Sequence, residues 1–286
     1  MRLALAQISS SPDRQRNIDR VLQAMDDAGA AGADLVVFPE VVLDRFFPAQ
    51  RREACPLPVD DFAETIPGPT TELLQAKAKE HGLVTVFNLY ERDGDKRYDS
   101  SPVIDADGTL LGVTRMLHIC DYEGFHEQDY YDQGPVSSEQ TGVPVYDTAA
   151  GKIGVAICYD RHYPEVMRGL ALAGADLVVV PQAGTLGEWP EGLFEGELQV
   201  AAFQNGYFAA LSNRVGVEDT LTFAGESFVV DPQGHVLTRG KKLEEDLVVI
   251  DLDLSQAADA VGRKLFRRDR RPELYGAWLT REETHG

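Results

Sequence analysis

Cysteine is scarce in this chain, and no two cysteines stand close together. The 286 residues include only three, Cys55, Cys120 and Cys158, without a CxxC pair. An odd number at wide spacing is typical neither of a disulfide framework nor of a zinc site. The six histidines show no HxxxH or comparable ligand spacing, so we expect no bound metal and consider a metal-dependent hydrolase a poor interpretation.

Long apolar runs are also missing, and we expect no secretory leader. No uninterrupted apolar segment approaches the ~20 residues that a membrane-spanning helix needs. The N-terminal stretch MRLALAQISSSPDRQRN lacks a charged region followed by an apolar one. We therefore expect a cytoplasmic protein with reduced thiols and no membrane partner.

Basic residues are outnumbered by acidic ones. The chain has 27 Lys and Arg against 47 Asp and Glu, which gives a formal net charge of −20 at pH 7. Nucleic acid is therefore not an expected partner, because phosphate binding needs a basic face. Hydrophobic residues make up 43% of the chain, an ordinary share for a globular protein with a sizeable core.

What the sequence does contain is a recurring order of strand and helix patterns. Residues 2–40 read as strand, helix and apolar strand, and residues 151–182 repeat that order. The pieces GADLVVFPE (32–40) and GADLVVVPQ (174–182) nearly repeat each other. Further helices are expected over 70–81 and 195–205, and further strands over 82–91, 109–118, 207–216, 226–237 and 247–254. This order predicts an α/β protein without a linker that would divide it.

Six short motifs follow one another along nearly the whole chain. They are FPE (38–40), RMLHICDYEGFHE (115–127), IGVAICYDRHYPE (153–165), NRVG (213–216), GESFVVDPQG (225–234) and RRDRRPELY (267–275). Together they resemble the landmarks of the nitrilase (carbon–nitrogen hydrolase) superfamily, in that family's order. The resemblance implies a four-layer α-β-β-α sandwich of two mixed sheets, without a cofactor. It further implies one domain over residues 1–286, with about 276–286 as a tail, and a homodimer or higher assembly.

Cys158 stands where an apolar strand gives way to a helix. At such an elbow, backbone N–H groups favour an anion and can lower a thiol pKa or hold an oxyanion. The alternative is a buried structural cysteine, the usual fate of a free thiol. The flanking CYDRHYPE favours the first interpretation, and the resemblance implies that Cys158 is the nucleophile and the backbone N–H of Tyr159 an oxyanion donor. Cys55 and Cys120 are expected to be structural.

Two glutamates complete the implied catalytic set. Glu40 follows an apolar strand, at the edge of a sheet where α/β ligand sites gather. By resemblance it is the general base, and the alternative is a solvated strand-end carboxylate. Glu127 matches a second glutamate that many family members use to orient the substrate, and the alternative is an ordinary loop carboxylate.

The sequence departs from the family pattern at Met116. Most relatives carry a lysine there whose ammonium stabilises the tetrahedral intermediate, and a thioether offers no charge. Losing such a donor costs a factor of about 10² to 10³ in rate. Arg115 is a poor substitute because adjacent strand residues point to opposite faces, whereas His118 would share a face with Met116 if the strand persists. The alternative for His118 is a structural histidine, which we favour.

Few residues hint at the substrate. Arg161 resembles the position where carbamoyl-amino-acid hydrolases of the superfamily hold a carboxylate, and an ion pair with Glu165 or another local acid is an equal alternative. Trp189, Phe46 and Phe47 fall in segments expected to border the cleft, although aromatic residues in loops often merely pack.

Two functions remain open from the sequence. The first is thiol-dependent hydrolysis of a small amide or of an N-carbamoyl amine or amino acid, through an acyl-enzyme on Cys158; a nitrile substrate is less favoured. The second is a binding or regulatory protein that kept the pocket and lost turnover with the lysine.

Overall fold

The apolar segments of the sequence form strands of two mixed sheets. The computed structural model describes residues 1–135 and 143–279. The first sheet has the order β15-β1-β2-β3-β5-β4, with β6 beside β5. Its strands are β1 (Arg2–Gln7), β2 (Leu35–Val37), β3 (Val84–Val86), β4 (Leu89–Asp93), β5 (Lys96–Ile104), β6 (Leu110–Arg115) and β15 (Asp246–Asp251).

The second sheet has the order β14-β13-β10-β9-β8-β7. Its strands are β7 (Val145–Thr148), β8 (Gly151–Val155), β9 (Leu177–Gln182), β10 (Phe208–Asn213), β13 (Phe228–Val230) and β14 (Val236–Arg239). A separate hairpin pairs β11 (Val215–Glu218) with β12 (Leu221–Ala224). In both sheets the central strands are parallel and the outer strands antiparallel.

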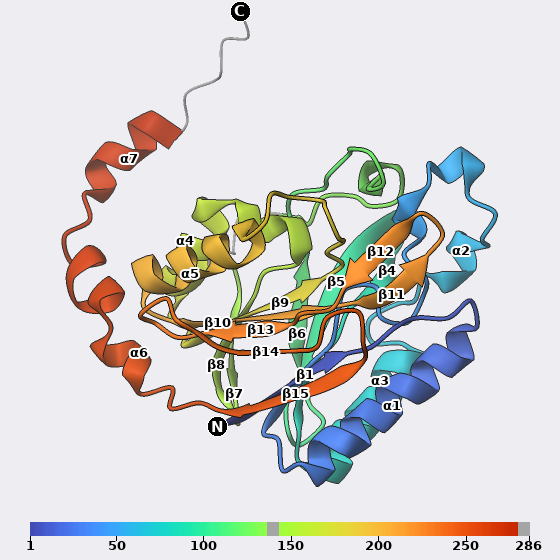
Figure 1. Ribbon diagram of the computed structural model, residues 1–286, viewed down its shortest axis with the longest axis horizontal. Coiled ribbons are helices and arrows are strands. Elements are labelled where there is room, and N and C mark those ends of the chain that lie inside the picture. The colour runs from blue at the N-terminus through green and yellow to red at the C-terminus, as the bar shows by residue number, and fades with distance from the viewer. Residues whose placement is uncertain (136–142, 280–286) are drawn as a thin grey trace, which may run out of the picture.

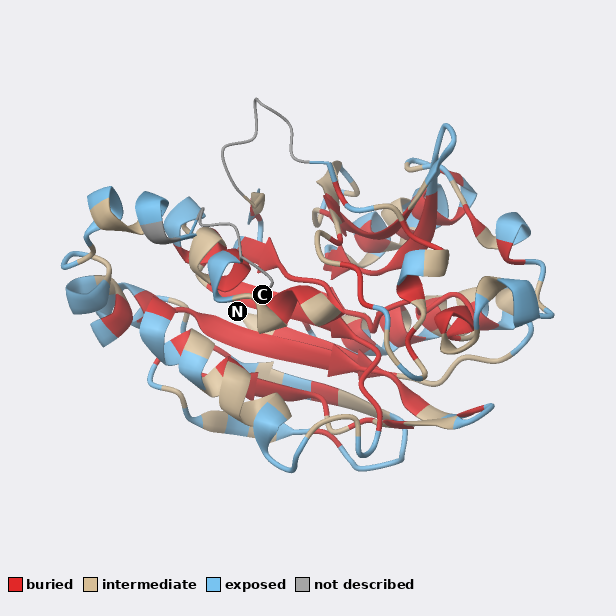
Figure 2. Ribbon diagram, turned by 90° about the horizontal axis from the view of Figure 1, so that it is seen from above, coloured by how far each residue is buried: buried red, intermediate tan, exposed pale blue. Residues whose placement is uncertain are grey.

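The two sheets face each other, and helices cover their outer sides (Figure 1). Helices α1 (Arg14–Ala30) and α3 (Pro69–His81) pack on the first sheet, and α4 (Pro164–Ala173) and α5 (Leu193–Asn205) pack on the second. Figure 2 shows the buried residues concentrated along the strands between these layers. The predicted four-layer α-β-β-α sandwich is therefore confirmed.

Alternation along the central strands explains why they are apolar throughout. Val37 of β2 faces the core between the sheets, while its neighbour Val36 faces the helices α1 and α3. In the second sheet, Val179 and Val178 divide in the same way. A strand that is covered on both faces needs apolar side chains at every position.

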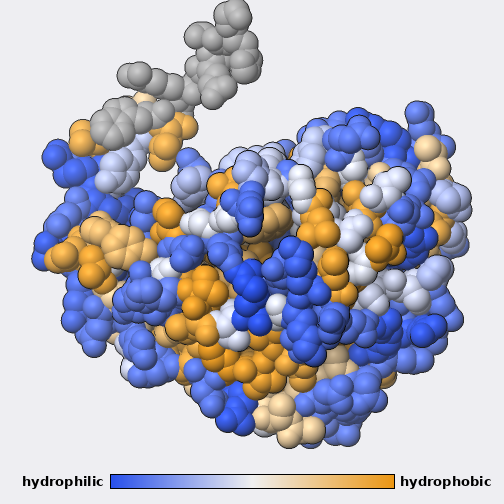
Figure 3. Space-filling view, viewed as in Figure 1, coloured by the Kyte–Doolittle hydropathy of each residue, from blue (hydrophilic) through white to orange (hydrophobic). Residues whose placement is uncertain are grey.

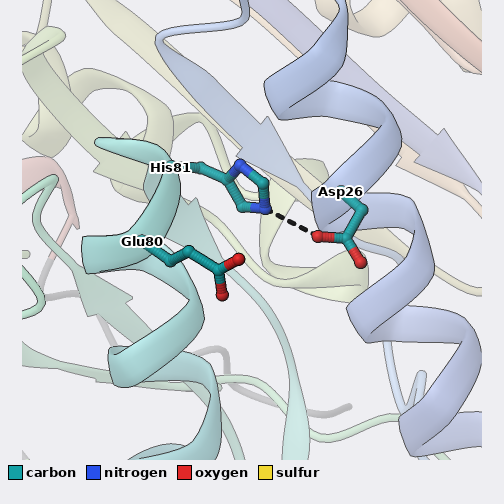
Figure 4. Close-up of side chains that lie close together, drawn as sticks. All are labelled: Asp26, Glu80 and His81. Atoms are coloured by element: carbon teal, nitrogen blue, oxygen red, sulfur yellow. Dashed lines mark hydrogen bonds and ion pairs between the residues drawn. The ribbon is translucent and has the colours of Figure 1, made fainter.

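The helices α1 and α3 lie side by side on the outer surface (Figure 1). His81 of α3 points toward Asp26 of α1, with 2.7 Å between Nε2 and Oδ1, and Glu80 lies beside them (Figure 4). Hydrogen bonds from Lys77 and His81 lower the pKa of Asp26. This partly exposed cluster connects α1 and α3 on the outer side of the first sheet.

Short helical turns follow several strands. They are η1 (Phe47–Ala49), η2 (Arg52–Ala54), α2 (Val59–Phe62), η3 (Glu127–Asp129) and η4 (Cys158–His162). The strand predicted over 109–118 is shorter than expected and stops at Arg115, and the first strand of 151–182 stops at Val155, before η4. After Arg115, Met116 N still donates to Asp99 O of the neighbouring strand β5, whereas Met116 O accepts from Gly134 N, which lies outside the sheet.

The C-terminal segment first packs against α5 through Ala260 and Arg263, and its last helix then extends away from the sandwich (Figure 1). It contains α6 (Gln256–Asp259), a π-helical turn η5 (Gly262–Phe266) and α7 (Pro272–Leu279). The start of the predicted tail at 276 thus lies within α7, and residues 280–286 are outside the described part of the chain.

The described residues include no helix that is long and apolar enough to span a membrane. Figure 3 shows apolar side chains gathered on the face over β14 and β15, strands that carry the exposed Leu237 and Val249. Exposed apolar patches of this kind often mark contact surfaces.

Candidate active site

The structure brings Glu40, Glu127 and Cys158 together. The sulfur and one carboxyl oxygen of each glutamate all lie within 4.8 Å of one another. Glu40 follows the end of β2 in one sheet, and Cys158 follows the end of β8 in the other. Glu127 begins η3, and all three side chains are buried. The carboxyl ends of strands from both sheets thus converge on one small cluster, as α/β ligand sites do.

Backbone geometry at this cluster is strained in two places. Cys158 has a φ of 40° and Val41, which follows Glu40, has a φ of 47°. Residues other than glycine in the left-handed region cost on the order of 1–3 kcal/mol, and such strain gathers at functional sites. At Cys158 the sharp turn separates the strand from η4 and places the thiol at the elbow that the sequence predicted.

The turn after Glu40 is held by two side chains, Arg214 and Asn88, from connections between other strands. Arg214 donates to the carbonyl oxygens of Glu40 and Asp44 at 2.9 and 3.0 Å, and also to that of Val41. The Oδ1 of Asn88 accepts from Val41 N at 2.7 Å. These bonds satisfy buried backbone groups and fix the direction in which the Glu40 side chain leaves the turn.

The cluster is strongly acidic. Burial, together with the charges of Asp99 and Glu127, raises the pKa of Glu40 well above its ordinary value. Burial also raises the pKa of Glu127 to about 8 and that of Asp99 to about 6. Among the described residues, no lysine or arginine bonds to these carboxyls, which leaves repulsion between them uncompensated. At neutral pH the cluster therefore retains protons.

Cys158 is a thiol rather than a thiolate at rest. Burial, followed by the charges of Glu40 and Glu127, raises its pKa well above the ordinary value. A hydrogen bond from the backbone of Ala183 acts in the opposite direction. A nucleophile at this position would have to lose its proton to a neighbouring base as it attacks, and the Glu40 carboxyl lies within 4.8 Å of the sulfur.

Comparison with known proteins shows the family to which the chain belongs. The family model described as carbon-nitrogen hydrolase matches residues 2–260. The chain belongs to the carbon–nitrogen hydrolase family.

Members of the family resemble the chain over nearly its whole length. N-carbamoylputrescine amidase of Arabidopsis thaliana is 32% identical, with 96% of this chain and 93% of that protein covered. The crystal structure of a carbon-nitrogen hydrolase from Helicobacter pylori G27 superposes with a TM-score of 0.88 at 27% identity, covering 98% of this chain and 99% of the other. A glutamate-to-glutamine variant of the amidase from Nesterenkonia sp. AN1 superposes with a TM-score of 0.79 at 28% identity, covering 98% of this chain and 97% of the other. In that structure the acetamide moiety of fluoroacetamide is covalently added to the active-site cysteine.

Met116, where the family resemblance led us to expect a lysine in relatives, lies in apolar surroundings. Met116 is fully buried in the same core cluster as Cys158. Arg115 turns away, as predicted, because it pairs with Glu91 and Asp93. Neither residue brings a positive charge to the sulfur.

His118 lies outside β6, so the strand alternation that would have pointed its side chain toward the site does not apply. The strand ends at Arg115, so Met116 and His118 share no strand face. The His118 Nδ1 lies 2.7 Å from Asp160 Oδ1, and its ring stacks on Tyr163 with 3.5 Å between centroids. This geometry favours the structural interpretation of His118.

Arg161 is sealed inside the fold. Its side chain has no exposed surface and forms an ion pair with Glu197, on α5. This ion pair matches the alternative in which Arg161 binds an acidic residue of the protein itself, although the partner is Glu197 and not Glu165. Binding of a substrate carboxylate by Arg161 stays a prediction that this geometry does not favour.

Aromatic side chains flank the cluster. The Trp189 ring contacts those of Tyr122 and His162, and the half-buried Tyr159 lies 6.3 Å from Tyr122 between ring centroids. Trp189 also lines a cavity of about 600 Å³ whose lining does not include Cys158. Phe46 and Phe47, by contrast, are buried and pack against other aromatic rings of the core.

Sequence reasoning missed Asp99, Gln182 and Arg214. Arg214 lies in the NRVG motif, which was noted without a role, and Gln182 ends a segment that nearly repeats the one ending in Glu40. Nothing in the local pattern marked Asp99. A thiol and two carboxyls are also ligand types that zinc accepts, and the expectation that this site works without a metal stays a prediction.

Proposed function

We propose that this carbon–nitrogen hydrolase cleaves a small amide or N-carbamoyl amine through an acyl-enzyme on Cys158. Glu40 takes the thiol proton as the sulfur attacks the carbonyl carbon, and the backbone N–H of Tyr159 donates to the oxyanion. The C–N bond then breaks, and the departing ammonia or amine takes the proton from Glu40. Water, deprotonated by the same carboxylate, adds to the thioester carbon and releases the acid with regeneration of the thiol.

The observation that carries this proposal is the meeting of Cys158 with Glu40 and Glu127 within 4.8 Å. A buried carboxyl with a raised pKa suits proton transfer near neutral pH. Glu127, with its pKa raised to about 8 by burial and by the charge of Asp99, is protonated at neutral pH and able to donate a hydrogen bond that orients the substrate.

Charge around the sulfur favours a substrate without a carboxylate. Besides the catalytic glutamates, Glu188 lies close enough for its charge to raise the pKa of Cys158. Glu188 is held by Tyr122 Oη at 2.7 Å and by Thr185 N at 3.0 Å. The nearest arginine along the chain, Arg161, is already paired. We therefore propose a neutral amide or a carbamoyl compound with a cationic end, in preference to an N-carbamoyl amino acid.

The competing proposal is a protein that binds such compounds and turns them over weakly or not at all. Met116 supports it, because the site lacks the ammonium that most relatives use to stabilise the intermediate. A homodimer or higher assembly and a cytoplasmic location also remain proposals, and the exposed apolar patch over β14 and β15 supports the first of them.

Ammonia release distinguishes the two functions. The panel contains a neutral aliphatic amide, an N-carbamoyl diamine and an N-carbamoyl-β-amino acid of matched length. We expect turnover of the first two, at least tenfold slower turnover of the anionic compound, and none of the panel turned over by Cys158→Ala. Absence of turnover by the wild type over a broad panel would favour the binding protein. Fastest turnover of the anionic compound would contradict the charge argument.

A further inference from the structure

Cys158 has a side-chain hydrogen-bond donor that the mechanism above does not use. Gln182 Nε2 donates to Cys158 Sγ at 3.1 Å, and the glutamine is buried. Gln182 is the last residue of β9, at the position that corresponds to Glu40 in the near-repeat of GADLVVFPE and GADLVVVPQ. The two equivalent positions thus place an acid and an amide against the same sulfur.

The direction of the Gln182 amide is fixed by Arg161. Arg161 Nε donates to Gln182 Oε1 at 3.0 Å, so the opposite end of the amide, Nε2, faces the sulfur. A flipped amide would point its N–H groups at the Nε–H of Arg161, and two donors would then meet in a buried site. The order Arg161, Gln182, Cys158 therefore has one consistent hydrogen-bond direction.

Arg161 is itself held firmly. It pairs with Glu197, which also bonds to His162 Nδ1 at 2.8 Å, and its guanidinium lies 4.4 Å from the centroid of the Phe194 ring. With no exposed side-chain surface, Arg161 has little freedom to turn. A preorganised donor of this kind does not have to reorient during the reaction, which is the property that makes oxyanion stabilisation effective.

We propose that Gln182 is a catalytic residue that donates to the developing negative charge, first on Cys158 Sγ and then on the substrate oxygen, and so replaces part of what the lysine supplies in relatives. The inference rests on the proposed hydrolase function. As the S–C bond forms, charge leaves the sulfur for the carbonyl oxygen, and the two N–H groups of Nε2 allow one donor to follow it. Gln182 neither gains nor loses a proton. Arg161 acts as a positioning residue.

The surroundings explain why a neutral amide suits this place. Met116 supplies no donor, and the charged groups closest to the sulfur are carboxyls that oppose a thiolate. A buried amide is satisfied by two hydrogen bonds and carries no charge that would have to be desolvated. It stabilises an anion less than an ammonium does, so we expect slower turnover than in a lysine-bearing relative.

Gln182→Met tests the proposal, because methionine has similar length and no N–H. We expect kcat to fall about 10²-fold, within the range for one oxyanion donor, with KM changed much less. Alkylation of Cys158 by iodoacetamide, followed by peptide mapping at that residue, should move to higher pH. The exposed Gln204→Leu serves as the control and should leave both measurements unchanged. Adding Met116→Lys to Gln182→Met should recover turnover.

The alkylation measurement keeps this inference separate from the proposed function. If the wild type turns over no substrate while Gln182→Met still shifts alkylation, the hydrolase proposal fails and the donor to the sulfur stands. A folded Gln182→Met with wild-type kcat and an unshifted alkylation profile overturns the inference. Gln182→Leu is the second variant, and loss of fold in both would show that the amide serves the fold instead.

Discussion

Glu40→Gln is expected to lower kcat by about 10²- to 10⁴-fold, the range for removal of a general acid–base group. The amide has nearly the shape of the carboxylate but cannot take the proton from Cys158 or return it to the leaving amine. Ammonia release under saturating substrate measures the effect. Glu123→Gln, an exposed glutamate on the same loop as Glu127, is the matched control and should retain wild-type turnover.

The pH profile adds a second test of the same residue. A base acts only when it is deprotonated, and burial together with neighbouring carboxyls raises the pKa of Glu40. Turnover by the wild type should therefore rise with pH through values above the ordinary glutamate pKa of about 4.3. Unaltered kcat in Glu40→Gln, or an acid limb at the ordinary glutamate value, would contradict the assignment of Glu40 as the base.

Arg214→Met is expected to lower the free energy of unfolding by about 3–5 kcal/mol, as removal of one partner from a buried ion pair does. Arg214 pairs with the buried Glu218 and donates to three backbone carbonyl oxygens of the turn after Glu40. Methionine fills similar volume but leaves these acceptors without donors. Urea unfolding followed by circular dichroism measures the change.

Activity should fall in Arg214→Met even where the protein is folded. The turn that carries Glu40 includes Val41 at a strained φ, and Arg214 holds the carbonyl groups on both sides of that strain. Arg271, in an exposed ion pair with Glu273, provides the control, and Arg271→Met should leave stability unchanged. Equal unfolding midpoints for Arg214→Met and the wild type would show that the clamp is unnecessary.

The central strands and the motifs that follow them were readable from the sequence. Continuous apolar segments predicted the buried central strands, and Glu40 and Cys158 were identified because each stands just beyond such a segment within a family motif. Where a strand stops was harder to predict. Alternation over 109–118 gave no reason to end at Arg115, because the bond of Gly134 N to Met116 O joins the chain to a segment outside the β5–β6 pair.

Side chains that act across the fold were the ones missed. Asp99 raises the pKa of Glu40 from a different strand, and Gln182 reaches Cys158 from β9. Arg161 was considered as a substrate ligand because it resembles a carboxylate-binding position of the family, whereas its partner Glu197 comes from α5. Contacts of this kind depend on how separate strands and helices are placed side by side, which periodicity within one strand does not encode.

The most direct test of the account is the site of covalent modification by fluoroacetamide, read by intact mass and peptide mapping. We predict one adduct per chain, on Cys158, with Cys55 and Cys120 unmodified and no adduct in Cys158→Ala. A weak electrophile of this kind selects the most reactive thiol of the chain. Modification of another cysteine, or an adduct that persists in Cys158→Ala, would contradict the claim that Cys158 is the nucleophile.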